Sequence, residues 1–172
     1  FTTKVSRPGS NFPNLSLKLN EKVMDYGTGK ITGGEEEYLI VLTKPIFNKY
    51  GKEVIIYSLS EEMEVYRKDI SDENPWKIAL GDVDGDGIDD ISIGVYKEAP
   101  LHPVRAKRPY IYSYIDGELE PKWRGSRLAR PFTDYVFLDI DQDGLDEIIS
   151  IEILENKDKL INTYKWKRYV IL

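Results

Sequence analysis

The stretch GDVDGDGIDDISIG, from Gly81 to Gly94, places five aspartates within nine residues and then continues directly into an apolar, β-branched run. Carboxylates this close together repel one another, whereas a run such as DISIGVY is typical of a buried strand. The stretch therefore predicts a cation held among the aspartates and a β-strand that leaves the loop.

The same pattern returns once, in LDIDQDGLDEIISIE from Leu138 to Glu152, where Asp139 lies 57 positions after Asp82. The same offset relates Tyr57 to Tyr114, well outside the acidic segments. A period that is supported in two separate regions indicates an internal repeat.

One further step back along the chain reaches an eroded copy of the loop. It begins at Asp25, and Gly27 and Gly29 replace the second and third aspartates. We therefore do not expect this copy to bind metal. The repeat predicts a single domain over residues 1–172, made of three units of about 57 residues whose acidic loops fall at about 25–37, 82–90 and 139–147.

Each unit has the pattern of short strands. EVIIYSL and MEVYRK form one predicted pair, and RPYIYSYI and ELEPKW form another around Asp116-Gly117, a type I′ hairpin signal. WKIAL and YVFLDI lead into the acidic loops, and DISIGVY and EIISIEIL leave them. SEEMEVYRKDISDE also fits a weak helix, and EILENKDKLINTY fits a helix or a hairpin, but the repeat favours strands in both.

Four antiparallel strands per repeat are typical of a β-propeller blade. We therefore predict an all-β fold of three four-stranded antiparallel blades. The third repeat lacks a last strand, whereas the N-terminal segment NLSLKLNEKVMDY supplies a strand that belongs to no repeat of its own. We expect this N-terminal strand to complete the last blade, which favours a monomer over a homodimer.

The spacing within the two intact loops predicts two calcium sites. Carboxylates stand at positions 1, 3, 5 and 9, and calcium takes six to eight oxygen ligands in a flexible cage. Gly87, at position 6, permits a sharp turn, and position 7 offers its backbone carbonyl. The predicted ligands are Asp82, Asp84, Asp86, the Ile88 carbonyl and Asp90 in one loop, and Asp139, Asp141, Asp143, the Leu145 carbonyl and Glu147 in the other.

Two alternatives bear on this prediction. A helix–loop–helix calcium motif needs a glutamate at position 12, where this chain has Ile93 and Ser150. The other alternative is an acidic turn without metal, in which the aspartates cap backbone amides. Two loops with the same spacing and the same glycine favour calcium. At position 8, Asp89 and Asp146 are expected to point to solvent or to loop amides.

Composition limits the class of protein. The chain is 41% hydrophobic and 31% charged, which is typical of a soluble globular domain. Its net charge of -6 argues against a general affinity for nucleic acid or anionic lipid but leaves room for a local basic patch. It has no cysteine and no apolar run long enough to span a bilayer. Because it starts at Phe1 without a signal-peptide pattern, we expect that a segment has been removed.

A second candidate site is basic. Arg124, Arg127 and Arg130 lie at three-residue spacing near Lys122. They form either an anionic-ligand site or a solvated connector whose arginines pair with the excess acid of the chain, and we favour the connector. His102 is the single histidine, and nothing around it indicates a histidine-dependent catalytic triad.

The acidic loops DVDGDGIDDI and DIDQDGLDEI resemble those of FG-GAP/VCBS repeats, which occur in integrin α-chain propellers and many bacterial surface proteins. The segment YIYSYIDGELEPKWRGSRLARPFTDYVFLDID also resembles repeats of secreted or lipid-anchored bacterial proteins. This resemblance implies propeller blades, an extracellular or lipoprotein setting, and calcium in a structural role. The chain departs from the family in having three repeats, because propellers of the family usually have more blades.

Three functions therefore stay open. We favour a calcium-stabilised β-repeat module at a bacterial cell surface that binds a protein or a glycan. The alternatives are a polysaccharide lyase or hydrolase built on the same scaffold, and a structural spacer of a surface lipoprotein. Because no motif marks a catalytic constellation outside the metal loops, we do not expect an enzyme.

Overall fold

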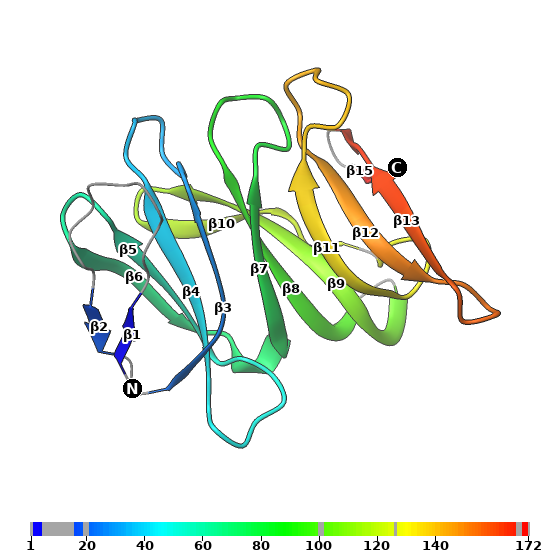
Figure 1. Ribbon diagram of the computed structural model, residues 1–172, viewed down its shortest axis with the longest axis horizontal. Coiled ribbons are helices and arrows are strands. Elements are labelled where there is room, and N and C mark those ends of the chain that lie inside the picture. Colours follow the sequence, from blue (N-terminus) through cyan, green and yellow to red (C-terminus); the bar gives the residue numbers. More distant parts are fainter. Residues whose placement is uncertain are drawn as a thin grey trace.

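The structure is a computed structural model and describes residues 2–4, 16–18, 21–99, 102–125, 127–167 and 170–171. Within these residues the chain is built from antiparallel strands and one short 3-10 helix, η1 (Figure 1). Three larger sheets follow one another along the sequence, with four, four and three strands. This confirms the prediction of an all-β chain.

The first sheet has the strand order β3-β4-β5-β6. Its strands are β3 (Lys22–Gly29), β4 (Tyr38–Lys44), β5 (Glu53–Ser58) and β6 (Met63–Asp69). After η1 (Ser71–Glu73), the second sheet follows in the order β7-β8-β9-β10. Its strands are β7 (Pro75–Gly81), β8 (Asp90–Ala99), β9 (His102–Ile115) and β10 (Glu118–Trp123).

The third sheet has the order β11-β12-β13. Its strands are β11 (Phe132–Leu138), β12 (Glu147–Ile153) and β13 (Lys159–Tyr164). Two short pairs complete the described elements: β1 (Thr2–Lys4) with β2 (Ser16–Lys18), and β14 (Trp166–Lys167) with β15 (Val170–Ile171).

Local turn chemistry explains the hairpins within the sheets. Asp116 and Gly117 join β9 to β10 with φ angles of 52° and 85°, the positive values that a type I′ turn requires. The segment that also fitted a weak helix forms β6 followed by η1, and the segment that fitted a helix or a hairpin forms the β12–β13 hairpin. The strand assignment is therefore confirmed in both cases.

The three sheets lie in a row, with β3, β7 and β11 side by side at the centre (Figure 1). One apolar core fills the space between the first two sheets, with Ile40 and Ile56 from the first meeting Ile91 and Ile93 from the second. A second core, rich in aromatic side chains, lies between the second and third sheets. Tyr135 is at its centre, 1% exposed, with three aromatic rings around it: Trp76, Phe132 and Phe137.

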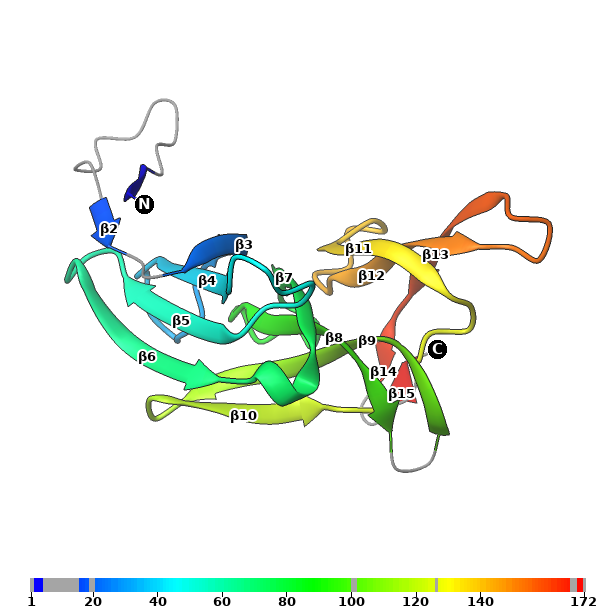
Figure 2. The same ribbon diagram turned by 90° about the horizontal axis from the view of Figure 1, so that it is seen from below.

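The N-terminal strand does not complete the third sheet, so that prediction is wrong for this structure. β2 pairs with β1, and this pair lies at the first-sheet end of the molecule, whereas β13 lies at the opposite end (Figure 2). Among the described strands β13 pairs only with β12. The row of sheets is therefore open, because its two ends do not meet.

Candidate metal centre

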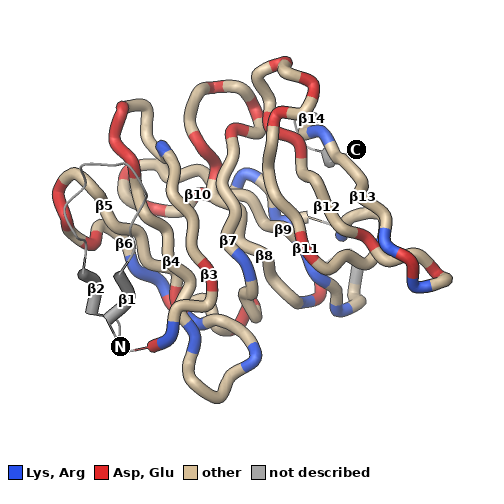
Figure 3. The backbone as a smooth tube through the Cα atoms, in the orientation of Figure 1, with Lys and Arg blue, Asp and Glu red and all other residues tan. Residues whose placement is uncertain are grey.

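The two acidic loops occupy equivalent places in neighbouring sheets. Residues 82–89 join β7 to β8, and residues 139–146 join β11 to β12. Both loops lie at the same end of the molecule, where acidic residues gather in several turns (Figure 3). The strand pattern of the sequence thus brings the two predicted sites to one edge of the fold.

The carboxylate at position 1 gives the first loop its curl. Asp82 accepts hydrogen bonds from the backbone amides of Gly85 and Gly87, both at 2.7 Å, and from that of Asp86 at 3.2 Å. Gly85 and Gly87 have φ angles of 77° and 80°, which glycine adopts without strain. In the second loop Asp139 accepts the equivalent bonds from residues 143 and 144, at 3.1 and 3.0 Å.

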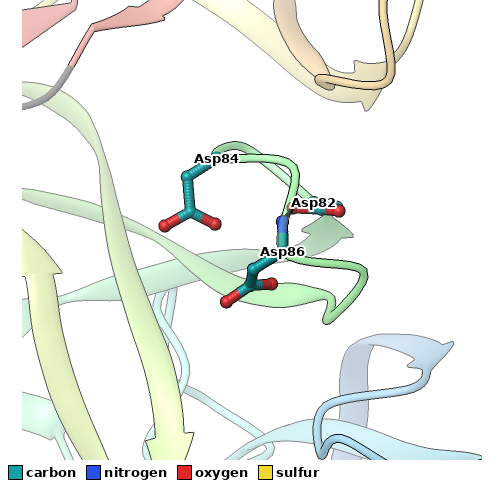
Figure 4. A group of neighbouring side chains, drawn as sticks. All are labelled: Asp82, Asp84 and Asp86. Carbon is teal, nitrogen blue, oxygen red and sulfur yellow. Dashed lines mark hydrogen bonds between the residues drawn. The ribbon is translucent and has the colours of Figure 1, made fainter.

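The curl gathers carboxylates into compact groups. In the first loop Asp82, Asp84 and Asp86 each offer an oxygen within 4.8 Å of the others, and Figure 4 shows Asp84 and Asp86 turned to the same side. In the second loop Asp139, Asp141 and Glu147 do the same. Two oxygens on opposite sides of one calcium ion lie about 5 Å apart. The carboxylate oxygens of each group are therefore close enough together to hold a metal ion.

The position-9 residues lie at the base of each loop. Asp90 is 3% exposed and accepts hydrogen bonds from the Ser113 hydroxyl and the Lys122 ammonium, both at 2.9 Å. Burial raises the pKa of Asp90, and Lys122 opposes that shift. Glu147 is 6% exposed and accepts the backbone amide of Ile140 at 3.1 Å. The carbonyls of Ile88 and Leu145 stay predicted ligands.

A lysine ammonium lies among the carboxylates of each loop, a feature that sequence analysis missed. Lys122 in β10 contacts Asp84 at 2.7 Å as well as Asp90. Lys165 contacts Asp141 at 3.0 Å, Glu147 at 3.2 Å and also Asp143. These ammonium groups stand in for a cation, so both loops have the geometry and charge to hold a positive ion. The two lysines occupy non-equivalent positions, which is why comparison of the repeats does not reveal them.

The aspartates at position 8 link neighbouring loops. Asp146 accepts the backbone amide of Asp82 at 2.9 Å, and its own amide donates to the Asp82 carbonyl at 2.7 Å. Asp89 forms the same pair of bonds with Lys30, at 2.8 Å each. The prediction that these side chains meet loop amides is confirmed, and the amides belong to the preceding loop.

This pairing corrects the position of the degenerate loop in the first unit. Lys30 bonds Asp89 as Asp82 bonds Asp146, so the degenerate loop of the first unit begins at Lys30. Asp25 instead lies inside β3, where it accepts the amide of Ile78 in β7 at 2.9 Å. The true offset between the first two units is therefore 52 positions, from Lys30 to Asp82. A lysine at position 1 strengthens the expectation that this loop binds no metal.

The three arginines of the connector do not form one cluster of free charges. Arg124 pairs with Glu73 at 2.8 Å and lies 5.3 Å from the ring centre of Tyr110. Arg130 pairs at 3.3 Å with Glu152, which is buried in the third sheet. Arg127 is exposed. The arrangement favours the connector that pairs with acidic residues over an anionic-ligand site.

Residues 74–104 match the family model of the FG-GAP repeat. This segment resembles an FG-GAP repeat. The FG-GAP match covers β7, the first acidic loop and β8, so it coincides with the loop whose sequence first indicated the family. No curated protein matches the chain. No helix among the described residues is long and apolar enough to cross a membrane.

Proposed function

We propose that the chain is a calcium-stabilised β-repeat binding module of a secreted or cell-surface protein. The observation that carries the proposal is the coincidence of the FG-GAP match with a loop whose three carboxylates, Asp82, Asp84 and Asp86, lie within 4.8 Å of one another. A second carboxylate cluster at the equivalent place in the next sheet supports two ions per chain.

In this proposal calcium has a structural role. Each loop joins the first two strands of its sheet, and each position-8 aspartate bonds the preceding loop. An ion that fixes a loop therefore also fixes the edge of the neighbouring sheet. The three sheets act as propeller-type blades, and calcium stiffens the end of the row at which their loops meet. Extracellular placement fits this role, because calcium is abundant there and weak sites are filled.

Thermal unfolding with and without calcium tests the proposal. If each site has a dissociation constant of about 10⁻⁴ M, about 1 mM calcium adds roughly 1.4 kcal/mol per site. Two sites then raise the melting temperature by about 5 to 10 °C for a chain of this length. Titration calorimetry should give two ions per chain.

The matched control is the double variant Asp84→Ala/Asp141→Ala, which removes one carboxylate from each loop. It should melt at the same temperature in chelator and in millimolar calcium, while magnesium should produce a smaller shift than calcium in the unmodified protein. Identical melting curves for the unmodified protein in chelator and in calcium would contradict the proposal.

A further inference from the structure

The loop between β4 and β5 presents two large apolar side chains to solvent. Phe47 is 98% exposed and Ile46 is 54% exposed. Figure 1 shows that this loop projects beyond the rest of the molecule at the end opposite the acidic loops. Phenylalanine and isoleucine are among the residues most often buried in soluble proteins. Two of them side by side at a projecting tip indicate a contact outside the chain.

The base of this loop is firmly held. The Asn48 amide donates to the Pro45 carbonyl at 3.2 Å, which closes a turn around the two apolar residues. Below the turn, the amides of Gly51 and Lys52 donate to the carbonyls of Pro75 and Thr43, at 2.7 Å each. The tip is thus presented on a fixed support and does not have to be ordered when it binds.

Lysines surround the apolar tip. Lys44 and Lys49 flank it in sequence, and Lys22 lies directly opposite Lys44 in the β3–β4 register. Within the described part of the chain no ion pair joins these three lysines to a carboxylate. The tip therefore has an apolar point and a positively charged collar.

Two acidic side chains near this collar, Glu21 and Glu53, pair with basic groups outside it. Glu21 lies 3.2 Å from Lys52, and Glu53 lies 2.8 Å from Arg67. Neither of these two carboxylates therefore neutralises a lysine of the collar.

The net charge of -6 does not cancel this local positive charge. β4 has seven residues and separates the acidic end from the tip by about 20 Å. That distance exceeds the screening length of about 8 Å at physiological salt. Figure 3 shows the acidic turns at the far end of the same strands. A surface that meets the tip experiences the lysines and not the acidic loops.

We propose that the β4–β5 loop docks the protein on an anionic lipid surface. Ile46 and Phe47 enter the boundary between headgroups and acyl chains, and the lysine collar lies at the level of the lipid phosphates. Apolar side chains in the interface combined with attraction to anionic lipid are the usual means by which proteins adhere reversibly to a bilayer. A projecting tip favours lipid over a protein partner, because lipid accepts a convex apolar group without a matching socket. The docked orientation directs the acidic loops away from the membrane.

Vesicle co-sedimentation of the intact chain tests this proposal. The probes are vesicles of phosphatidylcholine alone and of phosphatidylcholine mixed with phosphatidylglycerol, both in chelator so that calcium cannot bridge acidic loops to lipid. We expect binding to the mixed vesicles that weakens as salt rises. Ile46→Ala/Phe47→Ala should weaken it at least about tenfold, and Lys44→Gln/Lys49→Gln should weaken it by about the same factor.

The control variants are Ile161→Ala, which removes an apolar side chain that is 71% exposed on the third sheet, and Lys30→Gln, which removes a lysine from the acidic end. Both should bind the mixed vesicles as the unmodified protein does. Equal binding by the Ile46→Ala/Phe47→Ala variant would overturn the proposal. So would failure of the unmodified protein to bind mixed vesicles, a result that would direct the search to a protein partner for the tip. Because every assay is made in chelator, neither result depends on the calcium sites.

Discussion

At the scale of single residues, the lysine that contacts the carboxylates of each acidic loop competes with any metal ion for them. The carboxylates of Asp84 and Asp90 raise the pKa of Lys122 even though burial acts in the other direction. The side chain of Lys122 is 17% exposed, so its charge is partly shielded from water. A calcium ion that binds these carboxylates must displace the ammonium group.

Replacing Lys122 should therefore lower the stability of the fold and raise the calcium affinity of the Asp82 loop. In chelator, Lys122→Met should lower the free energy of unfolding by about 1 to 3 kcal/mol, because the buried Asp90 loses a charged partner. The affinity of the first loop for calcium should rise about tenfold, because a competing positive charge is gone. Calorimetry and melting curves measure the two effects. Lys68→Met, at an exposed position in β6, should change neither.

Asp25 provides the opposite case, an aspartate that supports the fold without serving the metal. Asp25→Ala removes the acceptor of the Ile78 amide and should cost about 1 to 3 kcal/mol of stability. The calcium stoichiometry should stay at two. Asp84→Ala should instead reduce it to one. Loss of an ion in the Asp25 variant would show that the degenerate loop of the first unit has been misassigned.

These residues also mark what the sequence can and cannot predict about the site. The alternate spacing of Asp82, Asp84 and Asp86 sufficed to predict a carboxylate cluster, because a tight loop leaves short side chains few other arrangements. The prediction that the degenerate loop begins at Asp25 was wrong because the offset of 57 does not hold between the first two units. The contact of Asp89 with Lys30, which reveals the shorter offset, crosses between sheets and leaves no local signal.

At the scale of strands, close packing between sheets depends on glycine. Gly81 ends β7, and a methyl group at this position would meet Asp146 at 2.7 Å and the side chain of Phe137. Gly81→Ala should therefore lower stability by about 1 to 3 kcal/mol through overpacking. A methyl group added at Gly33 would have no neighbour closer than 3.8 Å, so Gly33→Ala should change the melting temperature little. Equal melting temperatures for the two variants would contradict the close approach.

The strands themselves were predictable to different degrees. The β9–β10 hairpin followed from Asp116-Gly117, because a type I′ turn has a strong local residue preference. β6 was ambiguous for a physical reason. It is an edge strand of the first sheet in which Tyr66 is the one buried side chain, so its apolar alternation is faint. The repeat supplied the information that the local pattern lacked.

At the scale of the whole molecule, closure was the feature that the sequence could not decide. An incomplete last repeat and a spare N-terminal strand suggested that the two would pair. Pairing also requires the ends of the row to meet, and this depends on the twist and the number of sheets, which no local pattern encodes. In the structure the ends lie apart (Figure 2).

The bonds between loops should couple the two proposed calcium sites. Asp146 belongs to the loop of the second proposed site and holds the backbone of Asp82, a predicted ligand of the first. Asp146→Ala should therefore weaken calcium binding at the Asp82 loop by about fivefold or more, as measured by calorimetry with the predicted ligands of the second site unchanged. Glu155→Ala, an exposed carboxylate in the turn between β12 and β13, should leave both affinities unchanged. If calcium binds the two sites independently both in the Asp146→Ala variant and in the unmodified protein, coupling through this bond is excluded.

The same bonds give the molecule an order of disassembly. The amide proton of Asp82 is held by a side chain from the third sheet, and that of Lys30 by a side chain from the second. When the third sheet opens, the Asp82 amide becomes free to exchange with deuterium while the Lys30 amide stays protected. Opening of the second sheet releases the Lys30 amide. The exchange rates of the Asp82 and Lys30 amide protons therefore report the order in which the sheets open.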